Sequence, residues 1–285
     1  MTLVKILVHV SLALFASSTN LVSAQPATTP VGEVKGSGWE HTPASLAATV
    51  QQADLVIPAA VTGGAMFVGK FREAPTVKSA KVPVVLFLHG SSGLGLKAIG
   101  EWQQWLAVQG FASAAPDSFA LSDHVNYKSP IRKADYERIH ALRASEIAPM
   151  LAALNALPWV DGARIVLAGT SEGSVPVARY RGSEFAARML FAWSCETNYF
   201  VVEPQNAFEA DKPVLNVISA TDPFFSPSNA WLGNAAAKGH CAEALKDVKR
   251  ASVALIPGAP HTLLNLPAVR DITSGFLKAA LSPQP

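Results

Sequence analysis

Residues 169–173 are the part of the sequence best suited to chemistry. They read Gly-Thr-Ser-Glu-Gly, with a short apolar run before them and a helical pattern after them. A serine hydroxyl is a weak nucleophile unless it is presented to a base in a fixed geometry. A sharp turn from strand to helix provides that geometry, and flanking glycines let the strand and the helix come close together. We therefore predict that Ser171 is a nucleophile, although the same five residues without this context would also fit an ordinary tight turn.

The base that activates such a serine is a histidine, and the sequence contains seven. His261 follows the last expected strand, in the run Gly-Ala-Pro-His at 258–261, and is the predicted base. His124 and His240 fall in expected loops and are the alternatives. His140 falls within a long helical pattern, where we expect it on the solvated face.

The acid that orients the base should follow a strand and lie between the nucleophile and the base in the chain. Asp222 comes just after the apolar run 214–219 and meets both conditions. Asp117 also follows an expected strand, but it precedes Ser171 and is therefore the weaker rival. A serine, an acid and a histidine in this order can perform acyl transfer, in which the serine attacks a carbonyl carbon.

Acyl transfer also needs two hydrogen-bond donors for the negatively charged oxygen of the intermediate. One donor is expected to be the backbone N–H of Glu172, directly after the nucleophile. The second should come from the loop 89–93, His-Gly-Ser-Ser-Gly, where we assign it to Ser91, with Ser92 as the alternative. The donors are main-chain groups, so we expect the His89 side chain to be structural.

The side chain of Glu172 has no single assigned role. It could orient a loop, bind a cationic substrate group, or pair with Arg179 or Arg181. A structural ion pair or hydrogen bond is the favoured interpretation, because such networks are common around buried charges.

A sheet must position these residues, and apolar runs alternate with helical patterns along most of the chain. Such alternation predicts an α/β fold with a mostly parallel sheet. The continuous apolar run 82–88 is typical of a central strand buried on both faces. The other expected strands are 111–115, 164–168, 188–193, 214–219 and 252–256, with 54–58 and 65–69 as an antiparallel pair at the edge. The expected helices are 97–108, a long helix 133–157, one from about 173, and 272–281, while 195–212 leaves room for only a minimal cap.

Three of these segments resemble the dienelactone hydrolase group of the α/β-hydrolase superfamily. They are 89–93, the run Pro-Asp-Ser-Phe at 116–119, and 258–261, and the layout covers the chain from about residue 55. The resemblance implies a mostly parallel central sheet with helices on both faces and a minimal cap. It also implies hydrolysis with Ser171 as nucleophile, Asp222 and His261 as its partners, and Ser91 as an oxyanion donor.

One departure bears on the substrate. Dienelactone hydrolases carry cysteine at the nucleophile position, whereas this chain has Ser171, which favours a general ester or lactone over a dienelactone. Cys195 is not expected to substitute, because it follows a different strand. An acyltransferase with the same three residues, and a non-catalytic binding protein on the same scaffold, remain the alternatives. None of these needs a metal or an organic cofactor, and we expect a small ester or lactone as the partner.

The first 24 residues predict export. Lys5 precedes the apolar stretch 6–16, and Val-Ser-Ala at 22–24 suits cleavage by a signal peptidase. The apolar stretch is too short for a membrane-spanning helix, which needs about 20 residues. We expect a signal peptide at 1–24, a flexible leader at 25–43, one domain at 44–285, and a periplasmic or extracellular location without stable membrane insertion.

The two cysteines and the overall charge narrow the class further. Cys195 and Cys241 form an even pair, which in an oxidising compartment favours a disulfide over two separate buried thiols. Two cysteines without a histidine cluster do not make a zinc site. The formal net charge of +2, with no basic cluster, gives no electrostatic reason for nucleic-acid binding. Hydrophobic residues make up 49% of the chain and charged residues 15%, which fits a large buried core.

Overall fold

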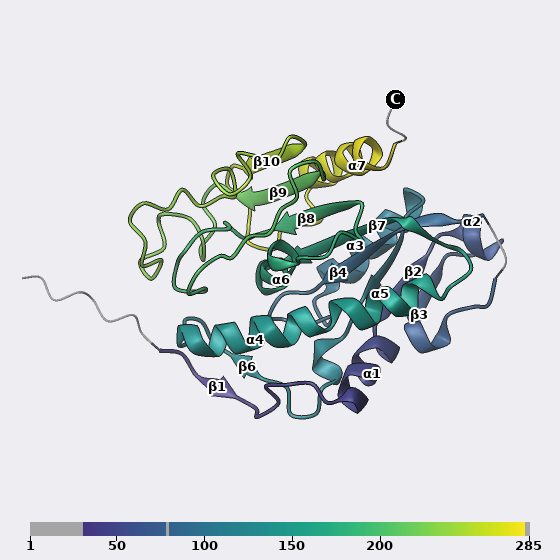
Figure 1. Cartoon of the computed structure of the whole chain (residues 1–285), viewed down its shortest axis with the longest axis horizontal. Coiled ribbons are helices and arrows are strands. Elements are labelled where there is room, and N and C mark those ends of the chain that lie inside the picture. Colours follow the sequence, from purple (N-terminus) through teal and green to yellow (C-terminus); the bar gives the residue numbers. More distant parts are fainter. Residues whose placement is uncertain (1–30, 78–79, 283–285) are drawn as a thin grey trace, which may run out of the picture.

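The protein is built around an eight-stranded sheet whose strands are mostly parallel (Figure 1). The computed structural model describes residues 31–77 and 80–282. The predicted signal peptide, 1–24, and the start of the expected leader lie outside these residues. Side by side, the strands are β10 (Ala251–Ile256), β9 (Val214–Ser219), β8 (Ala187–Phe191), β7 (Val160–Thr170), β4 (Val82–Leu88), β5 (Ala112–Ala115), β2 (Asp54–Ile57) and β3 (Phe67–Lys70).

The strands from β10 to β5 run parallel to one another, and β2 is antiparallel to both β5 and β3. The antiparallel pair at the edge is therefore confirmed. Because the carboxyl ends of parallel strands share one edge of the sheet, the segments after β4, β7, β9 and β10 all start at that edge. This is where ligands bind in open α/β sheets.

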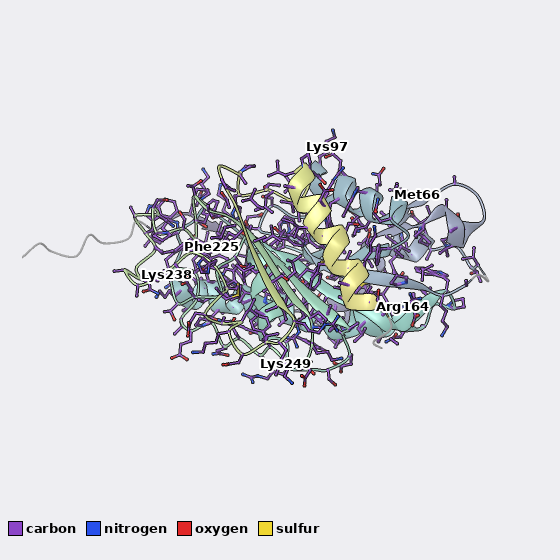
Figure 2. All side chains as sticks on the ribbon, turned by 90° about the horizontal axis from the view of Figure 1, so that it is seen from above. Met66, Lys97, Arg164, Phe225, Lys238 and Lys249 are labelled. Carbon is purple, nitrogen blue, oxygen red and sulfur yellow. A yellow bond between two sulfur atoms is a disulfide. The ribbon has the colours of Figure 1, made fainter. Side chains whose placement is uncertain are left out.

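Helices cover both faces of the sheet. The face that packs through Val50, Ile139, Leu154 and Val175 carries α1 (Pro43–Gln51), α4 (Lys133–Ser145), α5 (Ile147–Asn155) and α6 (Ser174–Arg179). The opposite face carries α3 (Lys97–Val108) and α7 (Pro267–Leu281). Seen from above, α7 crosses the parallel strands (Figure 2). Shorter pieces are α2 (Ala59–Thr62) and the 3₁₀ turns η1 (Phe71–Glu73), η2 (Ser118–Ala120) and η3 (Ser171–Gly173). The predicted fold class, a mostly parallel sheet with helices on both faces, is confirmed.

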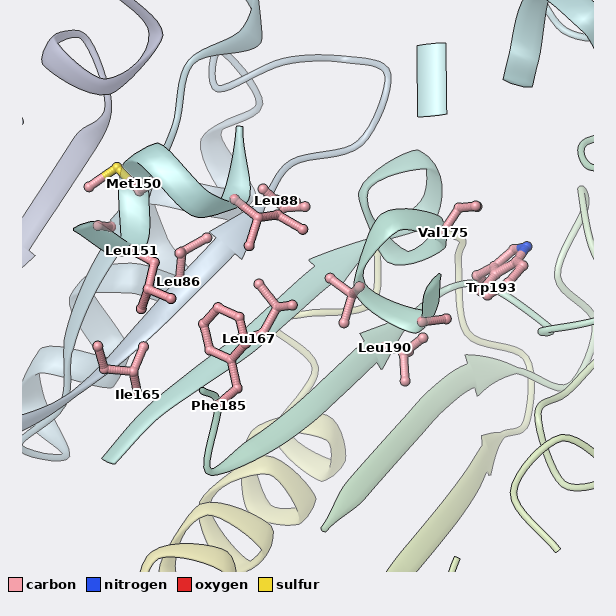
Figure 3. Packing of buried hydrophobic residues seen from close by; sticks show 14 of the residues in the cluster. Leu86, Leu88, Met150, Leu151, Ile165, Leu167, Val175, Phe185, Leu190 and Trp193 are labelled. Carbon is pink, nitrogen blue, oxygen red and sulfur yellow. The ribbon is translucent and has the colours of Figure 1, made fainter. Parts of the chain in front are cut away.

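The core beneath the carboxyl edge is aliphatic and aromatic. Leu86 and Leu88 of β4 and Leu167 of β7 lie beneath the helices on one face of the sheet (Figure 3). Each fully buried side chain of this kind stabilises the fold by about 1.5–3 kcal/mol relative to an exposed one. The central strands that carry the loops of the site are therefore rigidly held.

The prediction of one long helix over 133–157 is wrong in one respect. It is two helices, α4 and α5, which meet at Glu146. Pro149 lies in the first turn of α5, where it has no N–H for the carbonyl four residues earlier and its ring crowds that carbonyl. The break places the Glu146 side chain in the interior, where it is fully buried.

Much of the expected leader is held against the domain. Strand β1 (Val34–Lys35) pairs with β6 (Asn126–Tyr127) in a separate two-stranded sheet. The guanidinium of Arg138 stacks 4.2 Å from the centre of the Trp39 ring. The folded part of the chain thus begins before residue 44, because residues far along the sequence supply partners that local composition does not reveal.

Two irregular segments lie over the carboxyl edge, 192–213 and 220–250, and neither contains a helix or a strand. A disulfide between Cys195 and Cys241 joins them, as predicted. In the described part of the chain, each helix is too short or too polar to cross a bilayer.

Candidate active site

Ser171 is the first residue of η3, on a strained turn directly after β7. Its φ of 52° lies in the left-handed region, which non-glycine residues seldom adopt. A Cβ on Gly169 would lie 2.3 Å from the Gly173 carbonyl oxygen, and one on Gly173 would lie 2.2 Å from the Leu88 carbonyl oxygen. Both glycines are thus required by close backbone approach, as the sequence suggested. Ser174 holds the turn, because its buried hydroxyl donates to the carbonyl of Gly169 at 2.7 Å.

The structure brings Ser171, His261 and Asp222 into one hydrogen-bonded chain. His261 Nε2 lies 2.9 Å from Ser171 Oγ, and His261 Nδ1 lies 2.8 Å from Asp222 Oδ2. An ionised carboxylate only accepts hydrogen bonds, so the ring proton of the neutral imidazole resides on Nδ1. Nε2 is then free to accept the hydroxyl proton of Ser171. The three residues come from the ends of β7, β9 and β10, up to 90 positions apart in the chain.

Asp222 is held by its own backbone turn. Its Oδ1 accepts the N–H groups of Phe224 at 2.9 Å and Phe225 at 3.1 Å, which leaves Oδ2 for the histidine. The side chain is fully buried. The rival acid, Asp117, instead accepts the Phe119 N–H at 3.0 Å, and burial raises the pKa of its carboxyl.

Two contacts fix the loop that carries His261: a hydrogen bond to its backbone and a ring contact with the imidazole. Ser219 Oγ, at the end of β9, donates to the Ala259 carbonyl at 2.6 Å. The Phe224 ring packs edge-on against the imidazole, with ring centres 4.6 Å apart. These contacts limit the ring to a narrow range of orientations, which a base needs if it is to stay aligned with Ser171.

The predicted oxyanion loop passes beside Ser171. A Cβ on Gly90 would lie 3.4 Å from the Cβ of Ser171 and 3.4 Å from the Thr170 carbonyl oxygen, so the loop passes close to Ser171 there. Ser91, Ser92 and Ser171 line one pocket together with His261 and the apolar side chains of Leu96 and Leu264. Glu172 lies in the first turn of η3, where backbone N–H groups have no partner within the helix.

The Glu172 side chain turns away from this pocket into a buried charge cluster. Its Oε1 accepts a hydrogen bond from Arg143 Nη1 at 3.0 Å, and its Oε2 accepts one from the Tyr127 hydroxyl at 2.6 Å. Arg143 Nε also donates to Glu146 Oε2 at 3.1 Å. The structural ion pair expected for Glu172 is therefore present, but the partners expected for it, Arg179 and Arg181, are wrong.

Arg179 does not pair with Glu172, because it has another partner. The Arg179 guanidinium pairs with Glu137 instead, at 2.6 Å. Arg143 is only 1% exposed. Burial alone would lower the pKa of Arg143, but Glu146 and Glu172 outweigh it and hold that pKa above its ordinary value.

Two histidines near this cluster are buried. His89 is fully buried; its Nδ1 lies 2.7 Å from the Gly90 carbonyl, and its Nε2 accepts the Ser118 N–H at 3.3 Å. Burial and the nearby Arg143 hold the pKa of His89 well below its ordinary value. His140, expected on the solvated face, is 1% exposed, and burial lowers its pKa. That expectation is wrong because the buried stripe of α4 is wider than its apolar residues alone suggest.

We expect Arg143→Met to lower the free energy of unfolding by about 3–5 kcal/mol, because two buried carboxylates would lose their countercharge. Urea denaturation followed by circular dichroism measures the effect. The control is Lys249→Met. In the unchanged protein the Lys249 ammonium pairs with Asp211 at 2.7 Å, and the two side chains are 73% and 79% exposed, respectively. Such a surface pair contributes little, so no measurable change is expected. Equal stability of the two variants would contradict the assigned role of Arg143.

The sequence analysis did not identify Arg143 and Tyr127 as partners of Glu172.

Among the described residues, no group of three or more His, Cys, Asp or Glu side chains is placed to hold a metal ion.

Comparisons with known proteins rest on structure alone, since the sequence matches no protein-family model and no curated protein. A thermophilic esterase from the Planctomycetes species Thermogutta terrifontis, solved with propionate bound, has a TM-score of 0.51 at 15% identity, covering 91% of this chain and 99% of that chain. Its native form gives 0.50 at 14% identity, covering 91% of this chain and 96% of that chain. A dienelactone hydrolase from Anabaena variabilis gives 0.46 at 17% identity, covering 80% of this chain and 90% of that chain. With its parallel sheet, two helical layers and strained turn after β7, this chain has the α/β-hydrolase fold.

Proposed function

We propose that the protein is a secreted serine hydrolase that cleaves carboxylic esters or lactones through an acyl-enzyme on Ser171. The observation that carries the proposal is the hydrogen-bonded chain from Ser171 Oγ through His261 to Asp222, with the serine held at a positive φ beside a pocket. A serine in an ordinary turn has no need of a base at 2.9 Å or of a buried carboxylate behind that base. The arrangement of catalytic Ser171, His261 and Asp222 is one that recurs on unrelated folds in which serine attacks a carbonyl.

The proposed reaction follows from these atoms. His261 Nε2 accepts the hydroxyl proton as Ser171 Oγ attacks the carbonyl carbon of the ester. The negative charge on the carbonyl oxygen is stabilised by the backbone N–H groups of Ser91 and Glu172, and the Asp222 carboxylate stabilises the imidazolium. The carbon–oxygen bond to the alcohol then breaks, and the alcohol leaves with the proton from Nε2. A water molecule, deprotonated by the same nitrogen, then attacks the carbonyl carbon of the acyl-enzyme. The bond from that carbon to Ser171 Oγ breaks, Oγ takes back the proton from Nε2, and the acid is released.

The pocket supports a small uncharged ester or lactone as the substrate. Its lining combines serine and threonine residues with the apolar Leu96 and Leu264, and His261 is the one acidic or basic residue among the described residues that line it. The proposed group within the superfamily is the dienelactone hydrolase-like one, with serine as the nucleophile. The disulfide and the predicted signal peptide support export to the periplasm or the medium.

A fluorophosphonate probe tests the proposal, because it reacts only with an activated serine. We expect labelling of the native protein on Ser171, located by peptide mass spectrometry, together with hydrolysis of p-nitrophenyl acetate. Protein unfolded in urea is the control and should not be labelled. Native protein that neither takes up the probe nor cleaves the ester would contradict the proposal. With an added alcohol in the assay, free acid as the main product supports a hydrolase, and a new ester as the main product supports an acyltransferase.

A further inference from the structure

Arg143 holds both backbone segments that meet at the proposed oxyanion hole. Its Nη1 donates to the His89 carbonyl at 3.0 Å and to Glu172 Oε1 at 3.0 Å. His89 begins the loop that contains Ser91, and Glu172 directly follows the nucleophile. One nitrogen of a buried side chain therefore links the two segments.

Tyr127 makes a second contact with the Glu172 segment. Its hydroxyl donates to Glu172 Oε2 at 2.6 Å. Burial and the Glu172 carboxylate hold the pKa of Tyr127 well above its ordinary value. The phenol thus remains a donor to Glu172 and helps to fix the residue whose backbone N–H is a predicted oxyanion donor.

Both links have rigid supports. Arg143 is fixed from behind by Glu146, whose other oxygen lies 3.1 Å from His41 Nε2. The planar guanidinium presents its donors in a fixed fork, so the relative positions of its partners are closely defined. Tyr127 is held by the pairing of β6 with β1 and by edge-on packing against Tyr136, with ring centres 5.4 Å apart.

We propose that Arg143 and Tyr127 are positioning residues, which hold the backbone donors at Ser91 and Glu172 at the spacing that the oxyanion requires. This inference rests on the proposed function. Oxyanion donors act only when they lie about 2.7–3.1 Å from the developing charge, and a misplacement of about 1 Å reduces turnover by about 100-fold. Arg143 also offsets the negative charge of the Glu172 carboxylate, which would otherwise oppose the oxyanion, and the Tyr127 hydroxyl adds a hydrogen bond to the same carboxylate.

The test compares two tyrosines that are matched in their contacts. Tyr180, like Tyr127, donates its hydroxyl to a glutamate, Glu184, at 2.9 Å and packs edge-on against an aromatic ring, that of Phe185. Its hydrogen bond lies at the surface, away from the pocket. Each of Tyr127→Phe and Tyr180→Phe keeps the ring and removes only the hydroxyl.

For Tyr127→Phe we expect kcat for p-nitrophenyl acetate to fall about 10-fold, within the 100-fold limit for misplaced groups, with KM changed less than about twofold. The inhibition constant of propylboronic acid should rise by the same factor as kcat falls. This boronic acid forms a tetrahedral adduct with serine, so its affinity reports transition-state contacts. Arg143→Lys keeps the positive charge but loses the planar guanidinium with its several N–H donors, and it should reduce kcat about 100-fold. For Tyr180→Phe, we expect the values of the unchanged protein.

Each outcome decides the inference. Parallel losses of kcat and boronate affinity in Tyr127→Phe, at an unchanged melting temperature, support positioning. Equal kinetics for the two tyrosine variants, or a loss confined to KM, overturn it and leave the proposed function standing, provided that the unchanged protein is active. If the unchanged protein cleaves no ester and takes up no probe, the proposed function fails, and the inference fails with it.

Discussion

Replacing Ser171 with alanine is expected to reduce kcat for ester hydrolysis by about 10⁶-fold, the loss typical of removing a serine nucleophile from such a triad. The residual rate would come from binding and from the oxyanion donors, which do not need the hydroxyl. The fold should be retained, because alanine keeps the Cβ that the turn at φ 52° already accommodates. A stopped assay with high protein concentration measures the remaining turnover.

The control for this variant is Ser92→Ala. Ser92 is an exposed serine that lines the same pocket. Its replacement leaves the backbone N–H in place, so activity within a few-fold of the unchanged protein is expected. If Ser171→Ala retained activity while Ser92→Ala lost it, the nucleophile would have to be reassigned.

Asp222→Asn is expected to reduce kcat by about 10⁴-fold, as the equivalent change does in serine proteases. The reason is that the two oxygens of the Asp222 carboxylate have different partners. Its Oδ1 accepts the N–H groups of Phe224 and Phe225, so the asparagine would keep its oxygen there and present its NH₂ to His261. That NH₂ can only donate, and it would force the imidazole proton from Nδ1 to Nε2. An imidazole protonated on Nε2 cannot accept the proton of Ser171.

Asp117→Asn is the matched control for the acid. Its carboxylate accepts the Phe119 N–H, which an amide oxygen can also do, and it makes no contact with His261. We expect near-normal kcat. A large loss in Asp117→Asn with normal activity in Asp222→Asn would reverse the two assignments.

The parts of the site that sequence reasoning could predict are those with a local pattern. The glycines around Ser171 are needed for close backbone approach, so the turn is visible in five residues. Asp222 and His261 each follow an apolar strand closely, and parallel strands place such residues at one edge. Strand–turn spacing was therefore enough to bring together residues from three different strands.

Arg143 and Tyr127 could not be assigned this way, because their roles depend on contacts with distant segments. One signal was present, however. Tyr136, Ile139, Arg143 and Ile147 recur at spacings of three and four, so Arg143 falls on the buried stripe of the helical pattern. A charged residue on such a stripe needs a buried partner. The same reasoning would have placed His140 inside the protein.

The expected leader shows a second limit of prediction from the sequence. Its Pro, Thr and Gly content is typical of loose chain, yet Val34 pairs with Tyr127 and His41 bonds Glu146, 105 positions away. Tertiary contacts of this range leave no trace in local composition. They matter for the site, since β1 supports the strand that carries Tyr127.

The bond between Cys195 and Cys241 bears on how the protein is prepared. It joins the segment after β8 to the segment 220–250, which contains Asp222. A bacterial cytosol keeps thiols reduced, so recombinant material made there would have this loop untethered. Batches should therefore be checked by thiol titration, and produced in the periplasm or refolded with glutathione, before their specific activities are compared.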